Sequence, residues 1–225
     1  MGQLILHEDP LSANCYKIKL TAALLSIPLE RRRYSILAGE TKTPEFLQNI
    51  SAFGRIPVLQ IDATTLLPES NAACFYLAEN AASLSSSTST ASSPLLNLIP
   101  TSALQRADML RWMFFEQNNH EPTVATLRYW LYVLGEETLA EDRIVQLPGK
   151  RVAARQAIDY VEDRLSKSES GWLVGDGITL ADICLFAYTH LAHNSGFDLK
   201  DWPAVVAWCE RIKAVDGFIE YDESN

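Results

Sequence analysis

In the first eighty residues, short apolar runs alternate with stretches whose apolar residues recur at helical spacing. Leu4–His7 is a short apolar run that predicts a strand, and Asp9-Pro10 ends it. From Ala13 to Ser26 the apolar spacing predicts a helix that stops before Pro28. The remaining elements of this region are a strand at Glu30–Leu37, a short helix capped by Thr43, a hairpin of Ile56–Ile61 and Thr64–Leu67, and a helix at Ser70–Ala81. This order fits one sheet with helices packed on it.

The pattern changes twice after residue 81. Residues 85–93 are nearly all Ser and Thr, a composition typical of a flexible connection with few groups able to pack. Beyond them the sequence predicts mainly helices, at Leu104–Leu134 with a bend near Pro122, and at Arg151–Ser166, Thr179–Asn194 and Ala204–Val215. We therefore expect an α/β domain at residues 1–82, a Ser-rich linker at 83–101 and an all-helical domain at 102–225. For the linker, a phosphorylated regulatory loop is the alternative.

The charge of the chain is negative and uneven. It carries 19 Lys and Arg against 28 Asp and Glu, a formal net charge of −9. Residues 1–80 hold 7 basic and 8 acidic side chains, so the remainder holds 12 and 20, a difference of −8. Such a chain lacks the basic face that general nucleic-acid binding needs. The nearly neutral first third is the part better suited to an anionic ligand.

Targeting signals and cysteine pairs are not apparent. No apolar run approaches the roughly 20 residues of a membrane span, and the N-terminus lacks the basic start and long apolar core of a signal peptide. The 4 cysteines, at positions 15, 74, 184 and 209, form no C-x-x-C pair. We therefore expect a cytoplasmic protein with no membrane association, no disulfide framework and no metal site.

Two short segments of the α/β part suit a peptide with a free amino-acid end. A cis bond at Pro57 would turn the backbone of Ile56 outward, where an extended peptide could pair with it. Glu69-Ser70 stands where a helix begins, so the helix amides and the Ser70 hydroxyl favour a carboxylate. The Glu69 carboxylate can hold an ammonium group. The alternative is that Glu69 and Ser70 only cap the helix.

These segments resemble a known family. The resemblance is carried by Leu11–Ile18 (LSANCYKI), Gly54–Leu59 (GRIPVL), Glu69–Ala72 (ESNA) and Trp172–Ile183 (WLVGDGITLADI). The first three are similar to the N-terminal domain of the soluble (cytosolic) glutathione transferases, and the fourth to their C-terminal domain. Residues 114–122 resemble a subgroup of bacterial and fungal members, and the catalytic position is of the serine type. The resemblance implies a thioredoxin-like α/β domain that holds glutathione, followed by an all-α helical domain.

By this resemblance, Ser12 matches the position of the family's catalytic Ser or Cys. A hydroxyl there, at the start of a helix, can donate to the glutathione sulfur and favour thiolate over thiol. Lowering a thiol pKa by one unit takes about 1.4 kcal/mol. One charge-assisted hydrogen bond and the helix dipole can supply that amount. Asn14 is the alternative thiolate donor, since some relatives use Asn.

The resemblance also implies the other contacts to glutathione. Ile56 matches the residue whose backbone pairs with the tripeptide, Pro57 the cis-proline, Glu69 and Ser70 the pair that holds the γ-glutamyl end, Lys42 a basic position near the glycyl carboxylate, and Arg55 a position where many members have Gln. The Arg55 departure could add a charge contact to glutathione or leave the guanidinium in solvent.

A second, hydrophobic substrate pocket is expected on the helical domain. Trp112, Phe115, Glu116, Asn119 and Thr123 recur at helical spacing. Among them, Phe115 and Asn119 combine an apolar wall with a polar group, as ligand pockets do. The alternative is that this aromatic stripe belongs to the core.

Several other polar positions are interpreted as structural. Cys15 lies on the apolar face of the first helix, Thr179 and Asp182 form a capping box, Arg128 is expected in a surface ion pair, and His190 and His193 are expected on a solvated helix face. For Cys15, the alternative is a nucleophile for thiol–disulfide chemistry. For Arg128 the alternative is a contact to an anionic ligand, and for His190 and His193 it is a metal site, for which the sequence offers no third ligand.

The function implied by the resemblance is that of a glutathione transferase. Glutathione would be the co-substrate, and no metal or tightly bound redox cofactor is implied. Its thiolate would attack a hydrophobic electrophile or a hydroperoxide oxygen. Two alternatives remain: a ligandin that binds aromatic or polyphenolic small molecules, and an enzyme that reduces mixed disulfides through Cys15. The family's homodimer is the expected assembly.

Overall fold

The computed structural model describes residues 3–85 and 96–224. It divides into two compact units. Of the described residues, the first unit comprises 3–85, 96–99 and 215–224, and the second comprises 100–214. The Ser-rich stretch singled out in the sequence falls almost entirely outside the described residues. The predicted helical domain ran to residue 225, whereas the structure groups residues 215–224 with the first unit.

The first unit is built on a mixed four-stranded sheet of order β2-β1-β3-β4. The strands are β1 (Ile5–Glu8), β2 (Glu30–Arg33), β3 (Val58–Gln60) and β4 (Leu66–Pro68). β2 runs parallel to β1, while β3 pairs antiparallel with both β1 and β4. Leu6 and Leu59 are fully buried, so the sheet forms one wall of the core. The predicted α/β thioredoxin-like fold is confirmed.

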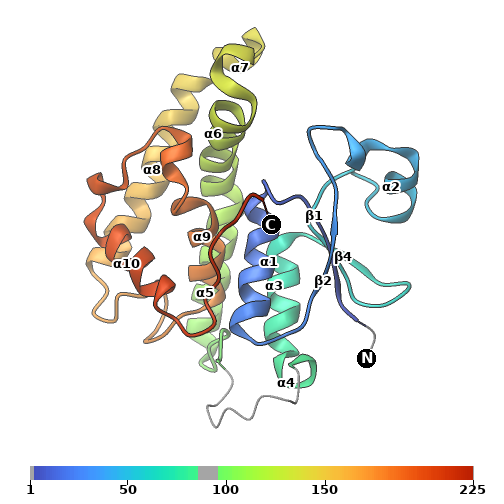
Figure 1. Ribbon diagram of the computed structural model, residues 1–225. Helices are drawn as coiled ribbons and strands as arrows, with labels where there is room; N and C mark the ends of the chain where they lie inside the picture. The colour runs from blue at the N-terminus through green and yellow to red at the C-terminus, as the bar shows by residue number, and fades with distance from the viewer. Residues whose placement is uncertain (1–2, 86–95, 225) are drawn as a thin grey trace. The chain divides into compact units, whose positions relative to one another are not determined.

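Helices cover this sheet. α1 (Ala13–Leu24) and α3 (Ser70–Glu79) pack against each other (Figure 1) and bury Ile18 and Leu77 completely. The shorter elements are η1 (Glu40–Lys42), α2 (Pro44–Asn49) and α4 (Ala81–Leu84). The Thr43 side chain caps α2, as predicted. The strand predicted at Glu30–Leu37 is shorter and ends at Arg33. The Tyr34 amide still donates to the Glu8 carbonyl of β1, but the amide of Ile36 donates to the Asp9 carboxylate and does not continue the ladder.

The C-terminal segment lies along α1. The Tyr16 hydroxyl donates to the carbonyl of Ile219 (2.7 Å), and the Tyr16 and Tyr221 rings meet edge to face. At Gly217, where φ is +85°, a Cβ atom would stand 3.2 Å from the carbonyl oxygen of Ala23. Only glycine fits both that close approach and that backbone conformation. These contacts explain why the segment belongs to the first unit.

The second unit is all-helical, as predicted. Its elements are α5 (Ala103–Phe115), η2 (Glu116–Ala125), α6 (Thr126–Arg128), η3 (Tyr129–Gly135), η4 (Glu136–Thr138), α7 (Glu141–Ile144), α8 (Leu147–Ser166), α9 (Leu180–Thr189), η5 (Ala192–Ser195), η6 (Leu199–Asp201) and α10 (Pro203–Lys213). Thr179 and Asp182 form the predicted capping box at the start of α9. Leu173, Ile183 and Val205 are among its fully buried residues.

The helix predicted at Leu104–Leu134 is continuous in the structure but contains both α-helical and π-helical segments. Its middle segments η2 and η3 are π-helical, so their hydrogen bonds span about five residues in place of four. This winding changes which residues share a face. Glu116 and His120 are fully buried, while Asn119 is exposed. The helical spacing assumed in the sequence therefore does not extend past Glu116.

Two polar residues of this unit are more buried than the sequence suggested. Arg128 is 3% exposed and stacks over Tyr132, so the surface position expected for its side chain is wrong. His190 stacks on Phe186, and its Nδ1 atom lies 2.7 Å from the Phe186 carbonyl oxygen. His193 is exposed, as predicted. The two histidines therefore do not share a solvated face.

Candidate functional site

The segments singled out in the sequence meet at one end of the sheet. In the strand register, Val58 is opposite both His7 and Pro68. The end of β1, the start of β3 and the end of β4 are therefore neighbours. Ser12 follows β1, Pro57 precedes β3, and Glu69 follows β4. The topology thus brings together three segments that are far apart in the chain.

Ser12 stands at the N-terminus of α1. Its amide donates to the Asp9 carbonyl (3.0 Å), and its own carbonyl accepts from the amides of Cys15 and Tyr16. The side chain is half-buried and makes no capping hydrogen bond to the helix. It hydrogen-bonds the Cys15 thiol instead. A hydroxyl that does not cap its own helix can turn to a ligand at the positive end of the helix dipole.

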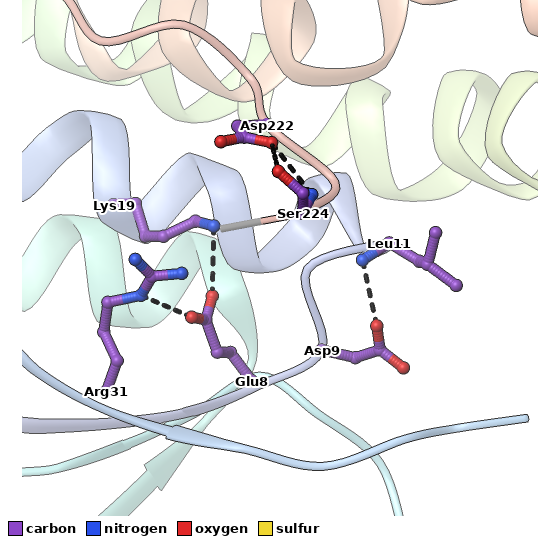
Figure 2. Close-up of polar contacts among 7 residues, drawn as sticks. All are labelled: Glu8, Asp9, Leu11, Lys19, Arg31, Asp222 and Ser224. Carbon is purple, nitrogen blue, oxygen red and sulfur yellow. Dashed lines mark hydrogen bonds and ion pairs between the residues drawn. The ribbon is translucent and has the colours of Figure 1, made fainter. Parts of the chain in front are cut away.

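The loop before Ser12 is held by Asp9, whose importance the sequence did not reveal. One Asp9 carboxylate oxygen accepts the amide of Leu11 (2.9 Å), as Figure 2 shows, and the other accepts the amide of Ile36 (2.8 Å). The side chain is 3% exposed. An Asp two residues before the amide it binds is a recognisable turn signal, which Asp9-Pro10-Leu11 carries. Asp9 therefore fixes the loop that presents Ser12.

The starts of α1 and α3 are joined by polar contacts. The Ser70 hydroxyl donates to the Asn14 side-chain oxygen at 3.4 Å. One turn further along α1, the buried Lys17 ammonium donates to the Asn71 side-chain oxygen at 3.3 Å. Asn14 is thus brought next to Ser70, one of the predicted γ-glutamyl contacts. The sequence predicted each of these two residues separately and did not predict their contact.

The peptide bond between Ile56 and Pro57 is cis, as predicted. Pro57 is buried, whereas Ile56 is partly exposed. Within the described part of the chain, neither the amide nor the carbonyl of Ile56 makes a hydrogen bond. An extended peptide could satisfy both groups by adding to this edge.

Glu69 has a conformation that is rare for a residue with a side chain. Its φ is +70°, and its carboxylate is exposed and does not cap α3. The carboxylate has no hydrogen-bond or ion-pair partner in residues 3–85 and 96–224. Ser70 beside it is 6% exposed and bonds Asn14. The alternative in which both side chains only cap the helix is therefore wrong.

Lys42 and Arg55 lie in two adjoining loops and differ in their surroundings. The Lys42 ammonium donates to the carbonyls of Phe53 (3.0 Å) and Gly54 (2.8 Å), so it holds the loop before the cis-proline. An ammonium has three donors, which leaves one for a ligand. The Arg55 side chain is exposed, and its guanidinium makes no ion pair with the residues that the structure describes. These are the two basic groups expected near a ligand carboxylate.

Cys15 is fully buried, as are Cys74 and Cys184, while Cys209 is 4% exposed. Burial raises the pKa of the Cys15 thiol to about 12, against the opposing effects of hydrogen bonds to Asp9 and Ser12. A thiol with such a pKa holds almost no thiolate at neutral pH and is a poor nucleophile. These observations favour the core interpretation of Cys15 over thiol–disulfide chemistry.

The predicted residues of the second pocket lie in the helical unit. The ring of Phe115 is half-buried and packs with Trp112 and Tyr160 at centroid distances of 5.4 and 4.9 Å. Asn119 is exposed, and its carbonyl accepts from Thr123. A surface hollow of about 520 Å³ in the same unit is lined by other residues, among them Asp108, Arg111 and Arg164. The assignment of Phe115 and Asn119 to a pocket stays a prediction.

The described residues contain no cluster of three or more metal-ligating side chains. Searched over the same residues, none of the helices is long and apolar enough to cross a membrane.

Comparisons with known proteins match both parts of the chain. The model of the glutathione S-transferase N-terminal domain matches residues 2–79, and that of the C-terminal domain matches residues 136–211. A crystal structure of a glutathione S-transferase from Pseudomonas fluorescens is 34% identical, with a TM-score of 0.81, and the match covers 98% of this chain and 99% of that one.

Two further relatives extend the comparison. Glutathione S-transferase F14 of Arabidopsis thaliana is 32% identical over 182 residues, which cover 79% of this chain and 66% of the plant protein. The structure of Ure2p in complex with glutathione shares the fold, with a TM-score of 0.79 over 96% of both chains, at 19% identity.

Proposed function

The chain belongs to the glutathione S-transferase family, and from that premise we propose that it binds glutathione at the end of its sheet and activates the thiol at Ser12. It is a glutathione transferase enzyme, with glutathione as its co-substrate. The observation that carries the proposed site is the set of unused groups gathered by the strand register. The unused groups are the backbone of Ile56 and the carboxylate of Glu69, and beside them stands the Ser12 hydroxyl, which bonds the Cys15 thiol and does not cap its helix.

Each part of glutathione has a complementary group here. The Glu69 carboxylate suits the ammonium of the γ-glutamyl end, and Ser70 at the start of α3 suits its carboxylate. The exposed backbone of Ile56 suits the cysteinyl amide and carbonyl. Lys42 and Arg55 suit the glycyl carboxylate. With these contacts made, the cysteinyl sulfur would lie near the start of α1.

Catalysis would then consist mainly of positioning and thiolate stabilisation. The Ser12 hydroxyl would leave Cys15 and donate to the sulfur, and the α1 dipole would favour its negative charge. We assign this role to Ser12 before Asn14, because Ser12 stands at the N-terminus of α1 and its hydroxyl does not cap the helix. The second substrate would be a hydrophobic electrophile or a hydroperoxide, bound against the helical unit with Phe115 and Asn119 as candidate contacts. The expected assembly is a homodimer.

Turnover of three substrates tests the proposal: a generic aryl halide, an organic hydroperoxide and a glutathione mixed disulfide. We expect turnover of the halide that falls at least tenfold in Ser12→Ala and is kept in Cys15→Ser. Absence of turnover with all three, together with micromolar binding of polyphenols, would establish the ligandin function instead. Mixed-disulfide reduction that disappears in Cys15→Ser would establish thiol–disulfide chemistry. Glutathione binding is measured in Ser12→Ala as well. If binding is lost, the fall in turnover reflects a binding defect and not the loss of thiolate stabilisation.

A further inference from the structure

A cluster of three charged residues lies directly before the proposed site, with a fully buried Glu8 carboxylate and with Lys19 and Arg31 side chains that are 10% and 28% exposed. Glu8 is the last residue of β1 and is fully buried. Its two carboxylate oxygens face different cations (Figure 2): Arg31 Nε of β2 at 2.5 Å and Lys19 Nζ of α1 at 3.1 Å. The cluster therefore ties together the end of β1, the strand beside it and the helix that begins at Ser12.

Burial makes the charges of this cluster matter more than charges at the surface. A buried carboxylate is tolerated when cations and hydrogen bonds compensate for its lost hydration. Glu8 has two cations for one carboxylate, and the side chain of Lys19 is only 10% exposed. Arg31 Nη2 is also buried and has no hydrogen-bond acceptor in the described residues. Charges so placed are weakly screened by solvent and salt.

The cluster is close enough to the start of α1 to act on it. Glu8 precedes Ser12 by four residues, and the Ser12 side chain hydrogen-bonds the Cys15 thiol. That same thiol experiences the charges of Glu8 and Lys19, which raise and lower its pKa respectively. Ser12, Cys15 and Lys19 follow one another on α1 at spacings of three and four, so they share one face of the helix, and the charges of Glu8 and Lys19 reach the turn that carries Ser12. Arg31 acts on that turn through its ion pair with Glu8.

We propose that Glu8, Lys19 and Arg31 set the electrostatic potential at the start of α1 and so govern how well a thiolate is stabilised beside Ser12. The three are positioning residues and do not touch the reacting sulfur. Lys19 and Arg31 offset the carboxylate, which would otherwise oppose a negative charge there. The assignment rests on the proposed role of Ser12 in glutathione activation.

Other charged groups near α1 have partners of their own. The Asp9 carboxylate accepts two backbone amides, and the carboxylate of Asp222, on the C-terminal segment, accepts the amide and hydroxyl of Ser224 (Figure 2). Lys17 donates to Asn71. These groups stay in place when the cluster is altered, so they set a constant background for the test.

The test uses a thiol placed at the site in the absence of glutathione. In a Ser12→Cys background, the rate of alkylation by iodoacetamide, a neutral reagent, is measured against pH. The native thiols contribute little, because they are buried and those of Cys15 and Cys209 have pKa values raised to about 12. The midpoint of the rate profile then reports the pKa of the introduced thiol.

The inference predicts shifts of opposite sign. Glu8→Gln removes the negative charge and is expected to lower the thiol pKa, while Lys19→Met and Arg31→Met each raise it, by about half a unit or more. A merely structural defect would not reverse sign with the charge removed. Arg31→Lys is expected to restore most of the native value. The control is Arg32→Met on the same strand, whose exposed side chain pairs with Glu30 and which is expected to cause no shift.

Equal pKa values in all variants, or shifts of one sign, would overturn the inference. If Glu8→Gln does not fold, the inference is still tested by the raised thiol pKa expected in Lys19→Met and Arg31→Met and by its return toward the native value in Arg31→Lys. Failure of the proposed function is distinguishable, because it appears as a native chain that binds no glutathione while these thiol shifts persist. If the native chain binds glutathione normally and the pKa of the introduced thiol is the same in all variants, this inference is wrong and the proposed function stands.

Discussion

Two helix starts, one in each unit, use similar residues for different purposes. α9 begins with Thr179 and Asp182, and the fully buried Asp182 carboxylate accepts from Thr179, from the amide of Leu173 and from the Trp208 indole. α3 begins with Glu69 and Ser70, and the Glu69 carboxylate is exposed and has no such partners in the described residues. We call the first the closed helix start and the second the open helix start.

The difference shows how the same chemistry divides between folding and binding. At the closed helix start, every donor comes from the chain itself, so the carboxylate contributes to stability and has nothing left for a ligand. At the open helix start, Glu69 is held at a φ of +70° with an unused carboxylate. Unusual backbone geometry of this kind is often retained at binding sites. A carboxylate's partners, more than its place on a helix, indicate its role.

The largest expected effect is the loss of the closed helix start. Asp182→Ala leaves the Trp208 indole and the Leu173 amide buried without an acceptor, which we expect to cost about 3 to 5 kcal/mol of unfolding free energy. Denaturant unfolding measures it. Asp176→Ala is the matched control, because Asp176 is exposed in the preceding loop. A change below about 1 kcal/mol would mean that the network is not a stability element.

The second prediction concerns the acid sensitivity of His190, which ends the helix that the closed helix start begins. Burial lowers the pKa of His190 to about 4. Between its ordinary value of about 6.5 and pH 4, the unfolded chain binds a proton that the folded chain does not. The unfolding free energy should therefore fall as pH drops through this window, by up to about 3 kcal/mol. Denaturant midpoints at pH 7 and 4.5 measure the fall, and His190→Gln should reduce it. If the unfolding free energy of His190→Gln falls equally steeply, the acid sensitivity arises from groups other than His190.

At the open helix start we expect the reverse balance. Glu69→Gln removes the partner of the γ-glutamyl ammonium and should weaken glutathione binding by about 1.5 to 3 kcal/mol, or roughly tenfold or more. Isothermal titration calorimetry measures this loss. The unfolding free energy should change by less than about 0.5 kcal/mol. Glu79→Gln, at the other end of the same helix, is the control. If Glu69→Gln destabilised the fold and left binding intact, the comparison would fail.

The smallest effect is expected at Arg55. Its side chain is exposed, so a contact to the glycyl carboxylate is screened and worth at most about 1 kcal/mol. Arg55→Gln should weaken glutathione binding by less than about fivefold, and the difference should vanish in high salt. Titrations at low and high salt measure it. A salt-independent loss would show that Arg55 acts through the structure of the loop.

Local signals made much of the site predictable. Proline at the start of a strand indicated the cis bend at Pro57, and Glu69-Ser70 indicated a helix start whose carboxylate could hold an ammonium group. The capping box was read from Thr179 and Asp182 alone. In each case the signal and the structure it specifies lie within a few residues.

Other features depend on contacts that no local pattern encodes. The burial of Arg128 and His190 follows from how π-helical segments and α9 pack, which periodicity assumed to be α-helical does not reveal. Glu8 was assigned no role from the sequence, because its partners Lys19 and Arg31 lie 11 and 23 residues further along the chain. The return of the C-terminal segment to α1 rests on Tyr16, about 200 residues earlier in the chain.

The central claim is that Ser12 stabilises the thiolate of bound glutathione. Thiolate absorbance of the glutathione complex, titrated against pH in the native chain and in Ser12→Ala, tests it most directly. The account predicts that the native complex has a thiol pKa at least about one unit below that of free glutathione and that Ser12→Ala raises it toward the free value. An unchanged pKa in Ser12→Ala with glutathione bound would contradict the claim, and a raised pKa in Asn14→Ala alone would transfer the role to Asn14.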